Sequence, residues 1–218
     1  MPWVTRGQPL PACPRWISHQ CPDMNQEPLI PIEVLTSSRQ VFALKHILSQ
    51  ERCIAVDTES NSRHKYPESV CLVQLATAKG VYLIDTLAVE EMRPLGEILA
   101  DEAVVKVIHG ADYDIRSLDR QWGFRIRNLF DTSVAARFVG IERYGLSALI
   151  AELLGVHIPK SGRIQKSDWS QRPLLQMALD YAATDVRYLL SIQRALEKRL
   201  RALKRERWVS EECCRLEE

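Results

Sequence analysis

The sequence predicts an α/β fold in which helices flank a mixed β-sheet. Two patterns carry this prediction: three apolar segments of strand length follow one another early in the chain, and the later strands alternate with helical patterns. The chain has 218 residues, of which 46% are hydrophobic and 26% are charged. A chain of this size and composition suits one large globular domain and excludes a disordered or disulfide-rich protein.

Local signals place the first half of the elements. Ser37 or Ser38 suits the N-cap of a short amphipathic helix that runs through Leu48. Apolar runs then predict strands at 53–57, 70–76 and 81–85, with Lys79-Gly80 as the turn between the last two. A helix near residues 92–100 and a buried strand at 104–108 follow.

The second half continues the alternation. The predicted elements are a helix with Ile115, Leu118 and Trp122 on one face, a short strand at 129–130, a helix from Asp131-Thr132 through Val139, and a helix at 145–154. Residues 159–172 form a polar loop. Pro173 stands at a favoured first helical position and opens a long helix predicted to run past Leu203.

The ends of the chain differ from the middle in composition. The first 31 residues carry seven of the eleven prolines, which disfavours both a helix and a central strand. We therefore expect a Pro-rich flexible arm at 1–28, one domain at 29–212 and a short tail at 213–218.

Charge and composition exclude several classes of protein. The 29 basic and 28 acidic side chains give a net charge of +1, which excludes a globally basic nucleic-acid binder but allows a local basic groove. No apolar run approaches the roughly 18 residues needed to span a membrane, and the start lacks the apolar core of a secretory signal. We expect a cytoplasmic protein with no membrane partner. The six cysteines lack the C-x2-C spacing of zinc sites.

Two acidic side chains share one strand. Asp57 ends an apolar strand and Glu59 lies two residues further on, so both carboxylates project from the same face. Neighbouring like charges are costly unless a cation lies between them, and carboxylate oxygens suit Mg²⁺ or Mn²⁺. The alternative is a solvated strand end that carries two charges.

Two further segments bear acidic groups. Tyr181 and Asp185 are spaced i and i+4, which puts a phenol and a carboxylate on one helical face; a core tyrosine beside an exposed aspartate is the alternative. The segment from His109 follows a predicted strand and opens a helix. Its two aspartates, Asp112 and Asp114, lie about 200° apart around that helix, and geometry alone does not choose between them.

These three segments together resemble a known family. Val56-Asp57-Thr58-Glu59, His109-Gly110-Ala111-Asp112-Tyr113-Asp114 and Tyr181-x-x-x-Asp185 resemble the three motifs of DEDD-superfamily 3′–5′ exonucleases of the tyrosine type, in particular RNase D and the exonuclease subunit of the nuclear exosome. Gln74-Leu75, residues 129–132 and residues 167–174 add to the likeness, which covers roughly residues 32–212. Three motifs in order with these intervals make a strong signal.

The resemblance implies a fold and an active site. It implies an RNase H-like fold in which two divalent metal ions, Mg²⁺ or Mn²⁺, are held by Asp57, Glu59, Asp114 and Asp185. The family motif places its carboxylate five residues after the histidine, which selects Asp114 over Asp112. Tyr181 is expected to position the attacking water, and Thr58 and His109 to contact the substrate. We expect Asp85 and Asp131 to serve as turn or capping residues.

A basic loop precedes the last motif. Residues 160–172 include Lys166 and Arg172 together with Trp169, and such a loop suits a groove for single-stranded phosphates with base stacking. We therefore predict these three side chains to contact substrate. The basic residues of 187–207 are attributed instead to the solvated face of a helix with an apolar stripe.

The activity implied is that of a metal-dependent 3′–5′ exoribonuclease. It would remove nucleotides from single-stranded RNA 3′ ends, including tRNA precursors or short oligoribonucleotides, in RNA 3′-end processing or decay. The alternatives are a DNA 3′–5′ exonuclease on the same fold and a non-catalytic nucleic-acid-binding module. The presence of all five expected active-site side chains argues against the module. RNase D continues into helical HRDC domains, so we expect a catalytic domain alone; the sequence makes no prediction of oligomeric state.

Overall fold

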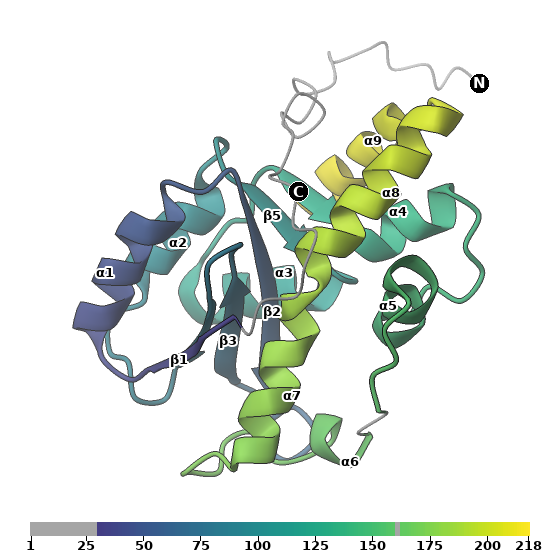
Figure 1. Ribbon diagram of the computed structural model, residues 1–218. Helices are drawn as coiled ribbons and strands as arrows, with labels where there is room; N and C mark the ends of the chain where they lie inside the picture. Colours follow the sequence, from purple (N-terminus) through teal and green to yellow (C-terminus); the bar gives the residue numbers. More distant parts are fainter. Residues whose placement is uncertain (1–29, 160–161) are drawn as a thin grey trace, which may run out of the picture.

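The computed structural model describes residues 30–159 and 162–218, and they form a single mixed sheet with helices packed around it (Figure 1). The predicted α/β fold class is thereby confirmed. The flexible arm expected at 1–28 lies outside the described residues.

Six strands make up the sheet of the described part of the chain. They are β1 (Ile32–Leu35), β2 (Cys53–Ser60), β3 (Val70–Ala76), β4 (Val81–Asp85), β5 (Val105–Ile108) and β6 (Leu129–Asp131). Their spatial order is β1-β4-β3-β2-β5-β6, in which β2, β3 and β4 pair antiparallel and the outer pairings are parallel. The strand β2 is therefore central, with β3 on one side and β5 on the other.

The helices connect and cover the strands. They are α1 (Ser38–Leu48), α2 (Arg93–Ala100), α3 (Asp112–Trp122), α4 (Thr132–Phe138), α5 (Leu146–Leu154), α6 (Gly162–Gln165), α7 (Gln176–Arg187), α8 (Leu189–Leu203) and α9 (Glu206–Leu216). The helix α7 packs across β2, β3 and β4, while α8 packs against α4 and α5 (Figure 1). Each residue of β3 and β4 is buried, so this sheet forms the core of the domain.

The sequence analysis missed β1. This four-residue strand pairs parallel with β4 at the edge of the sheet, and three of its four residues are exposed. An edge strand with so little burial has no continuous apolar run, which was the signal used for the other strands.

The long helix predicted from Pro173 is wrong in two respects. Helix α7 begins only at Gln176, and the helical segment is divided at Tyr188 into α7 and α8. The two halves pack on largely different partners: α7 lies across β2, β3 and β4, whereas α8 contacts α4 and α5 and, on the sheet, β2 and β5. A sequence pattern with one helical period does not reveal such a change of partner.

The tail expected at 213–218 is also wrong, because α9 continues through Leu216. The side chain of Cys213 is fully buried, and its Sγ accepts a hydrogen bond from the Asp131 backbone N–H at 3.4 Å. Glu217 Oε1 accepts another from the Leu129 backbone N–H at 2.8 Å. These contacts occupy outward-facing N–H groups of the edge strand β6, so the C-terminal helix closes that edge of the sheet.

No helix in residues 30–159 and 162–218 combines the length and the apolar character that crossing a membrane requires.

Candidate active site

The acidic end of β2 lies where its neighbour β5 stops. Cys53, Ile54 and Ala55 of β2 pair with residues 105–107 of β5. This register brings the last residue of β5 beside Val56, so the chain leaves the sheet next to Asp57 and the start of α3 stands beside the end of β2. The buried apolar half of β2 thus anchors two carboxylates that project at its open end.

A buried carboxylate holds the turn between β5 and α3. Gly110 adopts a positive φ of 74°, a conformation that side chains with a Cβ rarely adopt. Asp131 accepts hydrogen bonds from the backbone N–H groups of Gly110 and Ala111, and caps α4 through the N–H groups of Ser133 and Val134. The capping role expected for Asp131 is confirmed. Its second role, in fixing the segment that carries the site residues of α3, was missed.

The structure separates the two aspartates of α3. The side chain of Asp114 is buried, and its Oδ1 accepts a hydrogen bond from Thr58 Oγ1 at 2.5 Å. Asp112 is exposed and pairs with Arg116 one turn along the helix. Asp114 therefore belongs to the site, and Asp112 does not. The Thr58 hydroxyl orients Asp114, and the substrate contact predicted for Thr58 stays a prediction.

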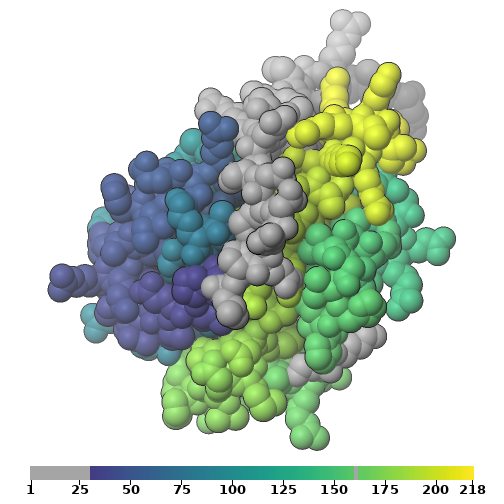
Figure 2. All heavy atoms as spheres, in the orientation of Figure 1, coloured from purple at the N-terminus to yellow at the C-terminus, as the bar shows by residue number. Residues whose placement is uncertain are grey.

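The helix α7 brings the third segment to the same place. A cleft of about 460 Å³ is lined by Asp57, His109, Tyr181 and Asp185, and by residues of α5, α6 and the segment between them. We call it the carboxylate cleft. Figure 2 shows the green surface around α5 beside that of α7 on the face that carries these helices. The cleft thus joins side chains that are up to 128 positions apart in sequence, from 57 to 185.

The four carboxylates act strongly on one another. Burial raises the pKa of Asp57 well above its ordinary value, and the charges of Asp114, Asp185 and Glu59 raise it further. Burial, followed by the charges of Asp185 and Asp114, raises the pKa of Glu59 to about 9. Collecting this much negative charge in a buried site destabilises the protein unless protons or cations neutralise it.

Each of the other two carboxylates accepts a hydrogen bond from a side-chain hydroxyl, which opposes the rise in its pKa. Burial raises the pKa of Asp114 to about 7, against the lowering effect of the Thr58 hydrogen bond. Burial raises the pKa of Asp185 to about 6, and a hydrogen bond from Tyr181 lowers it. Burial, and then the charge of Asp185, raises the pKa of Tyr181, so its phenol stays protonated at neutral pH.

This donor set fits hard divalent cations. Mg²⁺ and Mn²⁺ prefer oxygen ligands, which these carboxylates supply. The raised pKa values of Asp57 and Glu59 indicate negative charge that no cationic side chain among the described residues neutralises and that a bound cation would neutralise. Within the described ranges, no three His, Cys, Asp or Glu side chains already stand around a single ion. Closing these carboxylates on a cation therefore requires side-chain rotation.

His109 faces the carboxylate cleft as a neutral acceptor. Its Nδ1 lies 2.9 Å from Thr132 Oγ1, and the Thr132 hydroxyl donates its single hydrogen to the Ile108 carbonyl. This arrangement favours the tautomer with the proton on Nδ1, in which Nε2 is free to accept a hydrogen bond. Burial also lowers the pKa of His109, which favours the neutral ring.

The substrate contact predicted for Trp169 is wrong. This side chain is 1% exposed, and its ring lies 6.2 Å from the ring of Tyr181 at an angle of 40°. A base cannot stack on a ring enclosed in this way. Trp169 instead packs behind Tyr181 and restricts its orientation.

The substrate contact predicted for Arg172 is wrong as well. Its Nε and one terminal nitrogen donate to the two oxygens of Asp85, each at 2.6 Å. Its other hydrogen bonds go to the backbone carbonyls of Trp169, Gln171 and Cys71. All five N–H groups of the guanidinium are thus used within the protein, and none remains for a phosphate.

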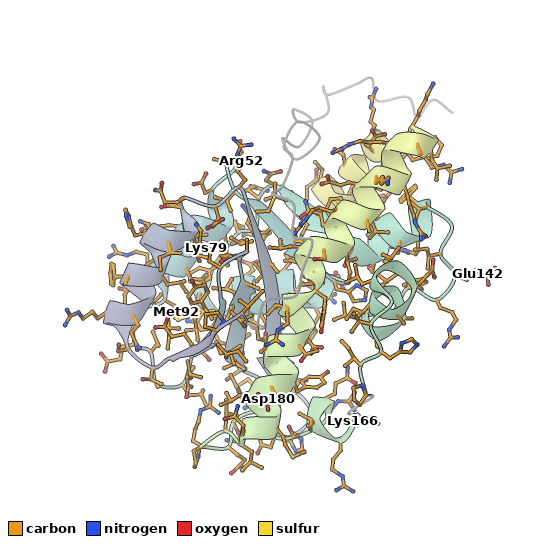
Figure 3. The ribbon with its side chains drawn as sticks, in the orientation of Figure 1. Arg52, Lys79, Met92, Glu142, Lys166 and Asp180 are labelled. Carbon is orange, nitrogen blue, oxygen red and sulfur yellow. The ribbon has the colours of Figure 1, made fainter. Side chains whose placement is uncertain are left out.

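Lys166, the third side chain of this loop predicted to contact substrate, stays exposed to solvent. Lys166 is exposed beside α6, while Asp180 lies on the exposed side of α7 (Figure 3). His64 Nε2 donates to the Lys166 carbonyl at 3.0 Å, so the loop after β2 contacts the loop before α7.

The sequence analysis missed a second groove, of about 710 Å³, which contains Arg143 and His157 and shares Gly145, Ser147 and Ile158 with the carboxylate cleft.

Comparison with known proteins identifies one matching family and several similar proteins. The family model described as a 3′–5′ exonuclease matches residues 32–201. Ribonuclease D of Granulibacter bethesdensis is 41% identical over 181 residues, which cover 82% of this chain and 45% of that protein. The exosome complex exonuclease RRP6 of Saccharomyces cerevisiae is 34% identical over 185 residues, which cover 84% of this chain and 25% of the relative. The chain thus spans less than half the length of these curated relatives.

Solved structures show the same likeness. The catalytic core of RRP6 from Trypanosoma brucei superposes with a TM-score of 0.81 at 28% identity, over 87% of this chain and 52% of that one. NrnC of Brucella melitensis, in a structure with bound Mg²⁺, gives a TM-score of 0.73 at 25% identity, over 85% and 89% of the two chains. Its structure bound to pGG gives 0.74 at 26% identity, over 86% and 90%. These matches confirm the RNase H-like fold.

The raised pKa values predict how stability depends on pH without metal. Carboxyl groups whose pKa is raised in the folded state stabilise it most below pH 4, and this contribution is lost as pH rises through about 6, 7 and 9 for Asp185, Asp114 and Glu59. In excess chelator, we expect the melting temperature of the wild type to fall relative to that of Asp57→Asn between pH 5 and 9.

The difference between the wild type and Asp57→Asn reports on the carboxylate site alone, because other buried titrating groups, such as Lys106, are common to both proteins. Thermal unfolding followed by circular dichroism measures the difference. A difference that stays constant over this range would show that the four carboxylates do not interact as described.

Proposed function

Because the chain belongs to the 3′–5′ exonuclease family, we propose that it hydrolyses phosphodiester bonds at the 3′ end of single-stranded RNA and releases one nucleotide at a time. The reaction uses divalent metal ions and serves RNA 3′-end processing or decay. The observation that carries the proposal is the convergence of Asp57, Glu59, Asp114 and Asp185. Burial raises the pKa of each, and the charges of the neighbouring carboxylates raise those of Asp57 and Glu59 further. Tyr181 lies beside them and donates to Asp185.

The carboxylates are the proposed ligands of two Mg²⁺ or Mn²⁺ ions. Such ions supply an activated water and neutralise charge on the phosphate and on the leaving oxygen. The protein's part is to hold four acidic groups from β2, α3 and α7 within reach of one another. Mg²⁺ in the related NrnC structure supports this proposal.

Tyr181 is proposed to orient the attacking water. Its raised pKa keeps the phenol protonated at neutral pH, so it cannot accept the proton of the water. Its hydroxyl is directed by the hydrogen bond to Asp185, and its ring is supported by Trp169. A phenol held in this way can fix the position of a water molecule next to the scissile phosphate.

His109 is proposed to bind the terminal ribose. An unprotonated Nε2 in the cleft can accept a hydrogen bond from a hydroxyl but repels a phosphate oxygen. The 3′-hydroxyl and the 2′-hydroxyl of a terminal ribonucleotide are donors of the required kind. This chemistry favours RNA, in which both hydroxyls are present.

The second groove gives the strand a route away from the carboxylate cleft. It adjoins the cleft along α5, and Arg143 and His157 line it. We name it the α5 groove and propose that it holds nucleotides upstream of the scissile phosphate. The structure of NrnC with pGG supports a short oligonucleotide as substrate.

The cytoplasmic location expected from the sequence stays a prediction.

The direct test uses an oligonucleotide labelled at its 5′ end. With Mg²⁺ or Mn²⁺, we expect a ladder that shortens RNA from the 3′ end by single nucleotides and requires a free 3′-hydroxyl. A matched DNA oligonucleotide should be cut more slowly, and Asp57→Asn should be inactive on both. Faster cutting of DNA would favour the DNA exonuclease, and binding without cleavage would favour the non-catalytic module.

The role of Tyr181 predicts a separate effect of Tyr181→Phe. We expect kcat to fall by about 10²-fold, with RNA affinity unchanged, because the variant loses the hydroxyl that orients water. Tyr82→Phe is a matched control, since Tyr82 is a buried tyrosine on β4 outside the cleft. Full activity of Tyr181→Phe would remove this residue from the mechanism.

The α5 groove predicts an effect that depends on substrate length. Arg143→Gln should reduce the slope of log affinity against log salt by about 1 for an octanucleotide and leave a dinucleotide unaffected. Arg125→Gln, which changes an exposed arginine paired with Asp119 on α3, is the control. An equal loss of affinity for both lengths would place Arg143 at the cleft rather than upstream.

A further inference from the structure

One buried glutamine has no hydrogen-bond partner within the described part of the chain. Gln74 lies in the middle of β3 with an exposed fraction of 0%, and neither Nε2 nor Oε1 has a partner. Gln193, which is buried to a similar degree in α8, donates to Glu197 Oε1 at 2.9 Å. An unpartnered buried amide destabilises a fold and calls for a physical explanation.

The strand register places Gln74 beside the candidate metal site. Gln74 pairs directly with Asp57 of β2 on one side and with Leu83 of β4 on the other. Directly opposite residues of an antiparallel pair point to the same face, with Cβ atoms about 4.5–5.5 Å apart. Of its two cross-strand neighbours, Asp57 alone bears a group that can accept a hydrogen bond from the amide.

Among the residues that the structure describes, no side chain donates a hydrogen bond to Asp57. The hydrogen bond that lowers its pKa comes from the Thr58 backbone, whereas Asp114 and Asp185 each receive one from a side-chain hydroxyl. Carboxylates that bind metal are held in place by such donors. Among the described residues, Asp57 and Glu59 are thus without a side-chain donor, and Asp57 is the one that lies opposite the amide without an acceptor.

We propose that Gln74 is a positioning residue, whose side-chain N–H donates to the Asp57 carboxylate when that carboxylate rotates to hold a divalent ion. The proposal rests on the metal-dependent function proposed above. It explains why a buried position between Asp57 and Leu83 carries an amide rather than an apolar side chain. Gln74 lowers the stability of the metal-free fold and fixes the orientation of the loaded site.

The test measures Mn²⁺ binding and metal-free stability, both without RNA. For Gln74→Met, which keeps the length of the side chain and removes the amide, we expect a metal-free melting temperature equal to or above that of the wild type. We expect its affinity for Mn²⁺ to be 10- to 100-fold weaker. The matched control Gln193→Met should melt at a lower temperature, because Glu197 Oε1 loses its amide donor, and should bind Mn²⁺ as the wild type does.

Two results would overturn the proposal. One is wild-type Mn²⁺ affinity in a folded Gln74→Met protein. The other is a metal-free melting temperature well below that of the wild type in both Gln74→Met and Gln74→Leu, which would show that the amide already has an essential partner. If the wild type itself binds no Mn²⁺ and leaves RNA intact, the proposed function fails instead, so the two failures are distinguishable.

Discussion

The collection of four carboxylates in one site, with Asp114 buried and the other three half-buried, is the constraint around which this domain is built. Asp57, Glu59, Asp114 and Asp185 come from three separate elements, and each has a pKa above its ordinary value. A fold tolerates such a cluster only if the rest of the structure holds the elements in place. The buried strands β3 and β4 and the packing of α7 across the sheet provide that support.

Several polar and aromatic groups around the cluster serve the scaffold rather than the substrate. Asp131 holds the turn before α3, and Arg172 joins Asp85 to three backbone carbonyls. Trp169 packs against the ring of Tyr181. Asp131 thereby fixes the segment that leads to Asp114. Trp169 supports Tyr181, and Arg172 ties the loop before α7 to β3 and β4. We therefore expect their substitution to act on activity through the geometry of the carboxylates.

The sequence predicted the fold class and the acidic residues because those signals are local or repeated in order along the chain. Apolar runs identified the buried strands, and three spaced motifs identified the segments that meet at the cleft. Trp169 and Arg172 were misassigned because a basic, aromatic loop looks the same whether it faces nucleic acid or the protein interior. The α5 groove and the partnerless amide of Gln74 depend on long-range placement, which strand register and packing determine.

The choice between the two aspartates of α3 offers the most direct test of the central claim. Asp114 is buried against Thr58, whereas Asp112 is exposed and paired with Arg116, although only two positions separate them. Titration with Mn²⁺ should show that Asp114→Asn loses binding that the wild type and Asp112→Asn retain. Equal binding by Asp114→Asn and the wild type, or loss of binding in Asp112→Asn, would contradict the convergence of these carboxylates on a shared metal site.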